Sequence, residues 1–155
     1  MQTTQTKAYI RWMIRRDLPE VLAIETASFE QCWSERDFLR AISERRTIGM
    51  VVEVDGLIVG YVIYQLGDVG IRIANLAVLP TMRREGIGRQ LIEKLISKLS
   101  VDRRRRIVAN ICESNLAAQL FLRDCGFKAI KVLKGLYVST DQDAYVFQYR
   151  LRPQR

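Results

Sequence analysis

The residues best suited to chemistry in this sequence form a short basic turn with two glycines, Arg83-Arg84-Glu85-Gly86-Ile87-Gly88. Glycine permits backbone conformations in which successive N–H groups point outward, and such groups bind anions. A helix that begins at this turn adds its unpaired N–H groups and the positive end of its dipole. Arg83, Arg84 and Arg89 add positive charge. The sequence therefore predicts a pyrophosphate site at the start of a helix.

Two common nucleotide-binding patterns do not fit this turn. The Gly-Lys-Ser/Thr end of a nucleoside triphosphate loop is missing, and a dinucleotide fingerprint would place a third glycine where Leu91 stands. A glycine turn before a helix also occurs without any ligand. The sequence around the turn must therefore indicate what binds there.

Several kinds of catalysis are excluded by composition. The chain has no histidine, which excludes a Ser-His-Asp triad, a Cys-His pair and His-ligated zinc. Its cysteines, Cys32, Cys112 and Cys125, have no metal-like spacing, so we expect no metal. The polar start of the chain does not resemble a signal sequence, and no apolar run is long enough to span a bilayer. We expect reduced thiols, a cytoplasmic location and no membrane partner.

The net charge of +8 favours anionic partners, although it equally suits plain solubility. The run Arg103-Arg104-Arg105-Arg106 is either a solvated loop or a contact for a phosphate. Because no aromatic residues are interleaved with these arginines, we do not expect direct nucleic-acid binding.

The elements that position the basic turn follow from periodicity. Apolar residues recur at helical spacing after Leu18-Pro19 and over residues 86–99. Ser34 with Asp37 is typical of a helix start, and Asp55-Gly56 between two β-branched runs predicts a hairpin. The expected strands cover residues 9–14, 48–54, 57–65, 71–78, 107–111, 127–133 and 144–151, and the expected helices cover residues 17–27, 34–43, 86–99 and 115–124.

The resulting order, β-α-α-β-β-β-α-β-α-β-β, fits an α/β (α+β) fold with a mixed central sheet and helices on both faces. We see no linker, and we expect a single domain over residues 1–155 with its core at about residues 9–151.

Three motifs in this order resemble the GNAT acetyltransferases. The basic turn resembles their acetyl-coenzyme A loop, with the pattern Gln/Arg-x-x-Gly-x-Gly/Ala. Asn75-Leu76-Ala77-Val78 resembles their fourth strand, and residues 113–121 with Cys125-Gly126-Phe127 resemble their second cofactor motif. The resemblance covers nearly the whole chain. It implies an N-acetyltransferase with a mainly antiparallel sheet of about seven strands.

The resemblance also implies where acetyl-coenzyme A, the acetyl donor, would be held. The backbone of Leu76, Ala77 and Val78 would pair with the pantetheine arm, where the fourth and fifth strands splay apart. Asn115 would contact the cofactor, although the same residue also suits a simple helix N-cap. The pyrophosphate would be held by residues of the turn, namely Arg83, Arg84, Glu85, Gly86, Ile87, Gly88 and Arg89.

Within the family, the resemblance is strongest to N-terminal acetyltransferases, above all the bacterial ribosomal-protein alanine acetyltransferases. Residues 24–35 resemble their first-helix loop, and Leu136-Tyr137 with residues 141–145 resembles their tail. Those two loops flank the peptide groove in the family, so Phe29, Trp33 and Tyr137 are expected to bind substrate. The implied partner is a protein or peptide N-terminus, such as that of a ribosomal protein, and the chain is expected to be a monomer or homodimer.

The sequence departs from this family at two catalytic positions. Asn110 stands where those enzymes carry a glutamate general base, and Leu122 stands where they carry a tyrosine general acid. Neither residue can perform that proton transfer. Because about one α-amine in ten is already neutral at pH 7, positioning can supply much of the acceleration.

Three residues are candidates for the missing proton chemistry. Asn110 would order a water molecule that takes the proton. Glu30 and Tyr137 are candidate replacements for the base and acid, with a solvated loop carboxylate and a packed aromatic ring as the structural alternatives. Two other functions stay open at this point: acetylation of a small amine or lysine, and acetyl-coenzyme A binding without turnover, which Asn110 and Leu122 favour.

Overall fold

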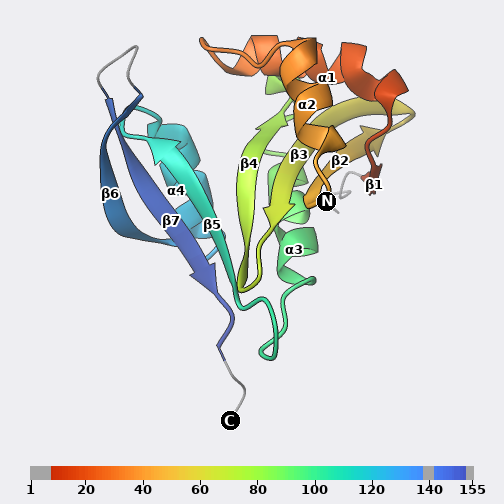
Figure 1. The fold of residues 1–155 in the computed structure, drawn as a ribbon. Helices are drawn as coiled ribbons and strands as arrows, with labels where there is room; N and C mark the ends of the chain where they lie inside the picture. The colour runs from red at the N-terminus through yellow and green to blue at the C-terminus, as the bar shows by residue number, and fades with distance from the viewer. Residues whose placement is uncertain (1–7, 138–141, 153–155) are drawn as a thin grey trace, which may run out of the picture. The chain divides into compact units, whose positions relative to one another are not determined.

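The computed structural model describes residues 8–137 and 142–152, and the elements follow the predicted order (Figure 1). Two short 3-10 helices, Arg15–Asp17 and Pro80–Met82, are additions to the prediction. The helices are α1 (Leu18–Ser28), α2 (Glu35–Ser43), α3 (Ile87–Ile96) and α4 (Leu116–Asp124). The strands are β1 (Tyr9–Trp12), β2 (Thr47–Val54), β3 (Leu57–Leu66), β4 (Gly70–Val78), β5 (Arg106–Cys112), β6 (Lys128–Tyr137) and β7 (Gln142–Arg150).

The strands form one seven-stranded sheet in the order β1-β2-β3-β4-β5-β7-β6. Strands β4 and β5 pair in parallel, from Gly70 with Arg106 to Ile73 with Ala109. The pairs β1–β2, β2–β3, β5–β7 and β6–β7 are antiparallel. A parallel pair needs a crossover connection, and α3 provides it. The predicted mixed and mainly antiparallel sheet is therefore confirmed.

The hairpin between β2 and β3 has the predicted turn. Asp55 and Gly56 both have positive φ, at 52° and 78°. Two such residues in succession define the type I′ turn that matches the twist of the flanking strands.

The chain forms two compact units, Met1–Leu66 with Ala74–Lys94, and Gly67–Ile73 with Leu95–Arg155. In the first unit, α1 and α2 pack on one face of the sheet through an apolar cluster. Tyr61 belongs to this cluster, so its neighbour Gly60 on β3 faces the other side of the sheet. A Cβ atom added to Gly60 would lie 3.5 Å from Ile87, so helix α3 lies on that other face. This unit therefore has helices on both faces, as predicted. The buried cluster contains Leu18, Val21, Ile24, Phe38, Val51, Ile58, Tyr61, Ile63 and Ala77.

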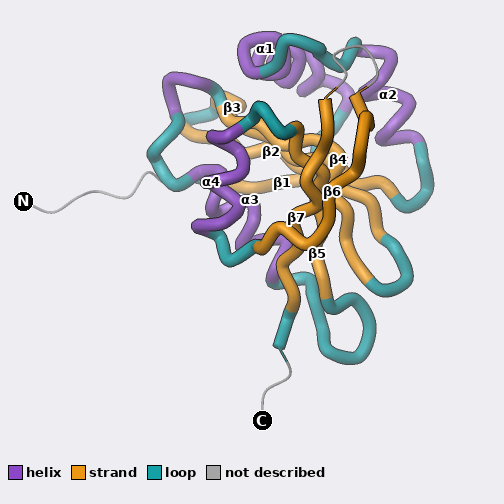
Figure 2. Tube along the Cα trace, turned by 90° about the vertical axis from the view of Figure 1, so that its left-hand side faces the viewer, coloured by secondary structure: helices purple, strands orange, loops and turns teal. Residues whose placement is uncertain are grey.

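In the second unit, α4 covers one face of β5, β7 and β6 (Figure 2). Gly126 and Phe127, which follow α4, lie against the ring of Tyr149 on β7, and the ring centroids of Phe127 and Tyr149 are 5.8 Å apart. Successive side chains of a strand point to opposite faces. Helix α4 therefore lies on the face that carries Tyr149, and Arg150 lies on the opposite face.

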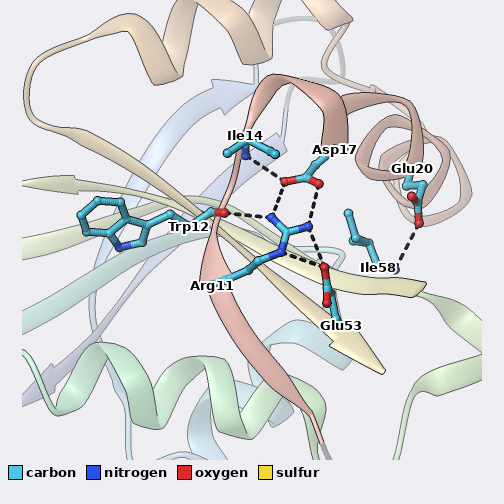
Figure 3. Close-up of polar contacts among 7 residues, drawn as sticks. All are labelled: Arg11, Trp12, Ile14, Asp17, Glu20, Glu53 and Ile58. Carbon is cyan, nitrogen blue, oxygen red and sulfur yellow. Dashed lines mark hydrogen bonds and ion pairs between the residues drawn. The ribbon is translucent and has the colours of Figure 1, made fainter. Parts of the chain in front are cut away.

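An ion-pair network fixes the entry to α1 (Figure 3). Arg11 on β1 donates to both carboxylate oxygens of Asp17, at 2.7 and 2.8 Å, and to Glu53 on β2 at 2.7 Å. Asp17 also accepts the backbone N–H of Ile14 at 2.8 Å. The hydrogen bond from Arg11 lowers the pKa of Asp17, which is almost fully buried. The network ties β1, β2 and the 3-10 helix that leads into α1 together.

Candidate active site

The basic turn between β4 and α3 has an unusual backbone. Arg84 and Gly86 have φ values of 68° and 77°, in the left-handed region. Glycine adopts this conformation freely, whereas arginine does so at a cost, and such strain is concentrated at functional turns. Nothing lies within 4 Å of the position that a Cβ atom of Gly86 would occupy. The turn therefore leaves open space beside its backbone.

Helix α3 starts directly at this open space. Its first helical hydrogen bond runs from Gln90 N to Gly86 O, at 3.1 Å. In a helix, the N–H groups before the first donor have no carbonyl partner within that helix. These include the N–H groups of Ile87 and Gly88, and the buried Ile87 side chain anchors them. The turn and the helix end thus have the geometry of an anion site.

The arginines of the turn have different surroundings. The Arg83 guanidinium donates to Val78 O and to Ser28 Oγ, each at 3.2 Å, and so braces the turn against β4 and α1. Arg84 and Arg89 are exposed. Arg83 is therefore a predicted phosphate ligand whose side chain also holds the turn itself.

The predicted pantetheine-binding residues, Leu76, Ala77 and Val78, form the last part of β4. They come after Ile73, the last residue of the parallel pairs with β5. The neighbouring strand approaches closely here, since a Cβ atom at Gly60 would lie 3.2 Å from Ala77 O. Glycine at position 60 permits this approach.

A buried carboxylate that the sequence did not single out as functional lies behind this strand. Glu25 on α1 is only 1% exposed. Its Oε1 accepts hydrogen bonds from Tyr61 Oη at 2.5 Å and Asn75 Nδ2 at 2.6 Å. Its Oε2 accepts the backbone N–H of Trp33 at 3.0 Å. Burial, and then the bond to Glu25, raises the pKa of Tyr61, so this phenol stays a neutral donor. Glu25 thereby joins α1 to β3, to β4 and to the loop before α2.

A signal for this burial exists in the sequence. Leu18, Val21 and Glu25 follow one another at helical spacing on the buried stripe of α1. A carboxylate on such a stripe needs donors, and its partners Tyr61 and Asn75 are far away in the sequence. The periodicity therefore shows that Glu25 faces inward, whereas only the folded chain shows what it contacts.

The loop between α1 and α2 carries three predicted site residues. Phe29 and Trp33 are half-buried and pack against the apolar cluster of the first unit. The ring of Trp33 meets Phe38 edge to face, with centroids 5.1 Å apart. Glu30 is exposed to solvent. The structure thus places the two aromatic residues as packed supports of the loop and places Glu30 at its surface.

The remaining predicted residues lie in the second unit. Asn110 is half-buried on β5 and pairs with Val146. The Oδ1 atom of Asn115 accepts the N–H of Ala118 at 3.1 Å, so this residue is a helix N-cap. Leu122 is only 3% exposed and is an interior apolar residue. Tyr137 is the last residue of β6, and its side chain and Asp141 lie outside the described residues.

Hydrogen bonds brace the base of the β6–β7 hairpin. Asp143 accepts the N–H of Gly135 at 2.8 Å, which lowers the pKa of its carboxyl group, and it pairs with Lys134 at 3.3 Å. Glu113, after β5, donates its N–H to Asp143 O at 2.9 Å. This hairpin is the tail that the sequence associates with peptide binding.

The described residues contain no group of three or more His, Cys, Asp and Glu side chains suited to a metal ion. In the same part of the chain, no helix has the length and apolar character needed to cross a membrane.

The fold and the glycine turn together define an acyltransferase class. Residues 11–127 match the Acetyltransferase (GNAT) family, and the chain belongs to that family, as the resemblance predicted. The [ribosomal protein bS18]-alanine N-acetyltransferase of Escherichia coli K12 is 29% identical over 132 residues, which are 84% of this chain and 88% of the relative. An N-alpha-acetyltransferase of Sulfurisphaera tokodaii is 25% identical over 143 residues, covering 84% and 85%.

Solved structures show the same fold. The ribosomal-protein-S18-alanine N-acetyltransferase from Escherichia coli superimposes with a TM-score of 0.83 at 24% identity and covers 96% of this chain and 97% of its own. Arabidopsis thaliana NAA60 in complex with acetyl-CoA gives a TM-score of 0.79 at 18% identity, with 93% and 98% covered. The predicted fold class is therefore confirmed.

Proposed function

We propose that this protein transfers an acetyl group from acetyl-coenzyme A to the N-terminal α-amine of a protein, such as a ribosomal protein, in the cytoplasm. The observation that carries the proposal is the left-handed turn at Gly86, which opens beside the first N–H groups of α3. The names of the relatives support an α-amine as acceptor. The bound thioester supplies an activated acetyl group that an amine can attack.

The residues of the turn fit a pyrophosphate. The N–H groups of Ile87 and Gly88 would bind its oxygens, since an anion is favoured at a helix N-terminus. Arg84 and Arg89 would add charge, and Arg83 would hold the shape of the turn. Because Asn115 uses its Oδ1 as a cap, its Nδ2 is the atom that would reach the cofactor. The complete proposed set is Leu76, Ala77, Val78, Arg83, Arg84, Glu85, Gly86, Ile87, Gly88, Arg89 and Asn115.

The acceptor amine must lose a proton to react, and the chain offers modest help. Asn110 would position a water molecule that takes the proton from an amine already partly neutral at pH 7. Tyr137 and Glu30 would be the remaining proton-handling groups. Positioning of the amine would then supply most of the acceleration. The hydrogen bond that Glu25 accepts from the Trp33 backbone N–H fixes the loop in which Phe29 and Trp33 would line the peptide.

Transfer of radiolabelled acetyl groups tests the proposal. The acceptors are peptides with a free α-amine, the same peptides with a blocked N-terminus and an internal lysine, and polyamines. We expect label only in the peptides with a free α-amine. Label in lysine or polyamines would instead identify a different acceptor, and tight binding of acetyl-coenzyme A without any transfer would identify a non-catalytic binding protein.

A further inference from the structure

A small group of polar side chains lies at the end of β5, next to the first residue of β7. The side-chain oxygen Oε1 of Gln142 accepts hydrogen bonds from the Ser114 hydroxyl, at 2.7 Å, and from the Cys112 thiol. We call these three residues the amide cluster. A hydroxyl and a thiol that both point at one atom identify that atom as an acceptor. The two bonds therefore fix which way the side-chain amide of Gln142 is turned.

The backbone around the two donors of the amide cluster is itself held in place. Gln119 on α4 donates its side-chain N–H groups to the carbonyl oxygens of Cys112 and Glu113, at 3.2 and 3.0 Å. Glu113 donates its N–H to Asp143 O at 2.9 Å, and its Oε1 accepts the N–H of Asp143 at 3.2 Å. These bonds join the turn after β5 to α4 and to β7. They hold the Gln142 amide in a single orientation.

The amide cluster lies on the face of the sheet that carries Asn110. Alternate residues of a strand share a face, and Asn110 and Cys112 are two apart on β5. The bond from Cys112 places the Gln142 amide on the same side. Tyr149 on β7 lies against Gly126 at the end of α4, and Gln142 is an odd number of residues away from it. This face is therefore turned away from α4.

The nitrogen of the Gln142 amide, Nε2, has two N–H groups to donate. Neither of them donates to another residue in the described ranges. Every buried side-chain nitrogen in the same ranges has a partner, so Nε2 is accessible to solvent. An amide that is held by its oxygen and open at its nitrogen is suited to bind a carbonyl group.

We propose that Gln142 Nε2 donates a hydrogen bond to a backbone carbonyl of the acceptor polypeptide, so that the enzyme favours peptides over small amines. This inference rests on the proposed function, because Asn110 is our proposed site for the reacting amine. Cys112, which contacts the amide, lies two residues from Asn110 on β5, or about 7 Å away. An extended peptide advances about 3.3 Å per residue, so the carbonyl of its second residue lies at a matching distance.

This contact distinguishes classes of acceptor without restricting their sequence. Every polypeptide has a carbonyl group in its second residue, whatever its side chains are, whereas a polyamine has none. The expected contribution is that of one neutral hydrogen bond, or about fivefold in kcat/KM.

The test compares two acceptors that differ by one residue. Alaninamide has only the first carbonyl group, and alanyl-alaninamide adds the second. We expect kcat/KM of the full chain to be about fivefold higher for the longer acceptor. The variant Gln142→Glu keeps an oxygen for Ser114 and Cys112 but has no N–H to donate. It should lose the gain while its KM for acetyl-coenzyme A stays unchanged.

The matched control is Gln148→Glu, which changes another half-buried glutamine on the same face of β7 and should retain the gain. Equal kcat/KM of the wild type for both acceptors would overturn the inference. An equal gain in the wild type and in Gln142→Glu would overturn it too, and would leave the amide cluster with a structural role alone.

NMR of the side-chain amide separates this inference from the proposed function. The Nε2 proton signals of Gln142, assigned by their loss in Gln142→Glu, should shift when acetyl-alanyl-alaninamide is added with coenzyme A. They should shift much less with acetyl-alaninamide. Signals that do not respond to the longer peptide would overturn the inference. If only the proposed function fails, neither free acceptor will receive an acetyl group, while the signals will still shift.

Discussion

At the scale of single side chains, three residues have distinct roles. Glu25 is a buried carboxylate that accepts hydrogen bonds from β3, from β4 and from the loop before α2. Asp17 accepts two hydrogen bonds from the Arg11 guanidinium at the entry to α1. Tyr137 closes β6 at the hairpin proposed to cover the peptide. The first two hold the scaffold, and the third is a candidate for the chemistry.

Replacing Glu25 with glutamine should destabilise the protein. A glutamine has one carbonyl oxygen and one NH2 group in place of the two carboxylate oxygens. Whichever way the amide is turned, its NH2 group faces either the Trp33 N–H or the donors of Tyr61 and Asn75, and those buried donors lose their acceptor. We expect the free energy of unfolding to fall by about 1–3 kcal/mol, measured by urea titration. Glu30→Gln, at an exposed position, is the control and should change stability by less than about 0.5 kcal/mol. Equal stability of the two variants would contradict the role given to Glu25.

The ion pair of Asp17 predicts an acid-sensitive component of stability. The folded pKa of Asp17 lies below its ordinary value of 3.8, so its contribution is complete above that value and is lost as pH falls through the folded pKa. Urea midpoints measured from pH 6 down to pH 2 should fall less steeply below about pH 4 in Asp17→Asn than in the wild type. Parallel curves would show that Asp17 contributes nothing to acid sensitivity.

Replacing Tyr137 with phenylalanine should slow turnover and leave the affinity for acetyl-coenzyme A nearly unchanged. The substitution removes only the hydroxyl that would handle a proton, and general acid or base catalysis is typically worth about 10²-fold or more. Initial rates across pH, together with calorimetric affinities, measure both effects. A rate that is unchanged at every pH would remove Tyr137 from the proposed mechanism.

At the scale of elements, the end of β4 and the start of α3 carry the proposed pyrophosphate site. The parallel pairs end at Ile73 and Ala109, and β4 then continues to the basic turn. Gly70 is essential to the first of these pairs because the Arg106 side chain occupies the space of its missing Cβ. A glycine in a strand often marks such a close approach.

Gly70→Ala should therefore be costly despite its small size. The added Cβ would lie 2.9 Å from Arg106 Cγ and also 2.9 Å from the Arg106 carbonyl oxygen, and the backbone atom cannot move without disturbing the strand pair. We expect a loss of about 1–3 kcal/mol in unfolding free energy. Val69→Ala, at the exposed neighbouring position, should have little effect. A stable Gly70→Ala variant would mean that β4 and β5 lie further apart than described.

At the scale of the whole molecule, the sequence predicted the order of elements because their signals are local. The Ser34 cap with Asp37, the Asp55-Gly56 turn and the periodic apolar stripes each act over a few residues. The α3 helix was predicted as residues 86–99 and is Ile87–Ile96, since helix ends depend on tertiary contacts. The family was also predictable, because the glycine turn and the fourth-strand motif lie close together in the sequence.

Contacts between residues far apart in the chain could not be predicted from the sequence. The partners of Glu25 lie 36 and 50 residues away, and the pairing of Arg106 with Arg150 joins two strands separated by a helix and a third strand. The run Arg103-Arg104-Arg105-Arg106 looked like one loop, whereas Arg106 belongs to β5 and faces Arg150. The sheet register places these two arginines opposite each other, and register is not visible in the sequence alone.

The most direct test of the account is the affinity of acetyl-coenzyme A for Gly86→Glu, measured by calorimetry beside Gly86→Asn. Asparagine tolerates the left-handed backbone and is neutral, so this control separates backbone strain from charge. We predict that the glutamate variant stays folded and loses detectable binding, because its carboxylate would meet the pyrophosphate, and that the asparagine variant retains most of the affinity. Wild-type affinity in a folded Gly86→Glu protein would contradict the proposed cofactor site.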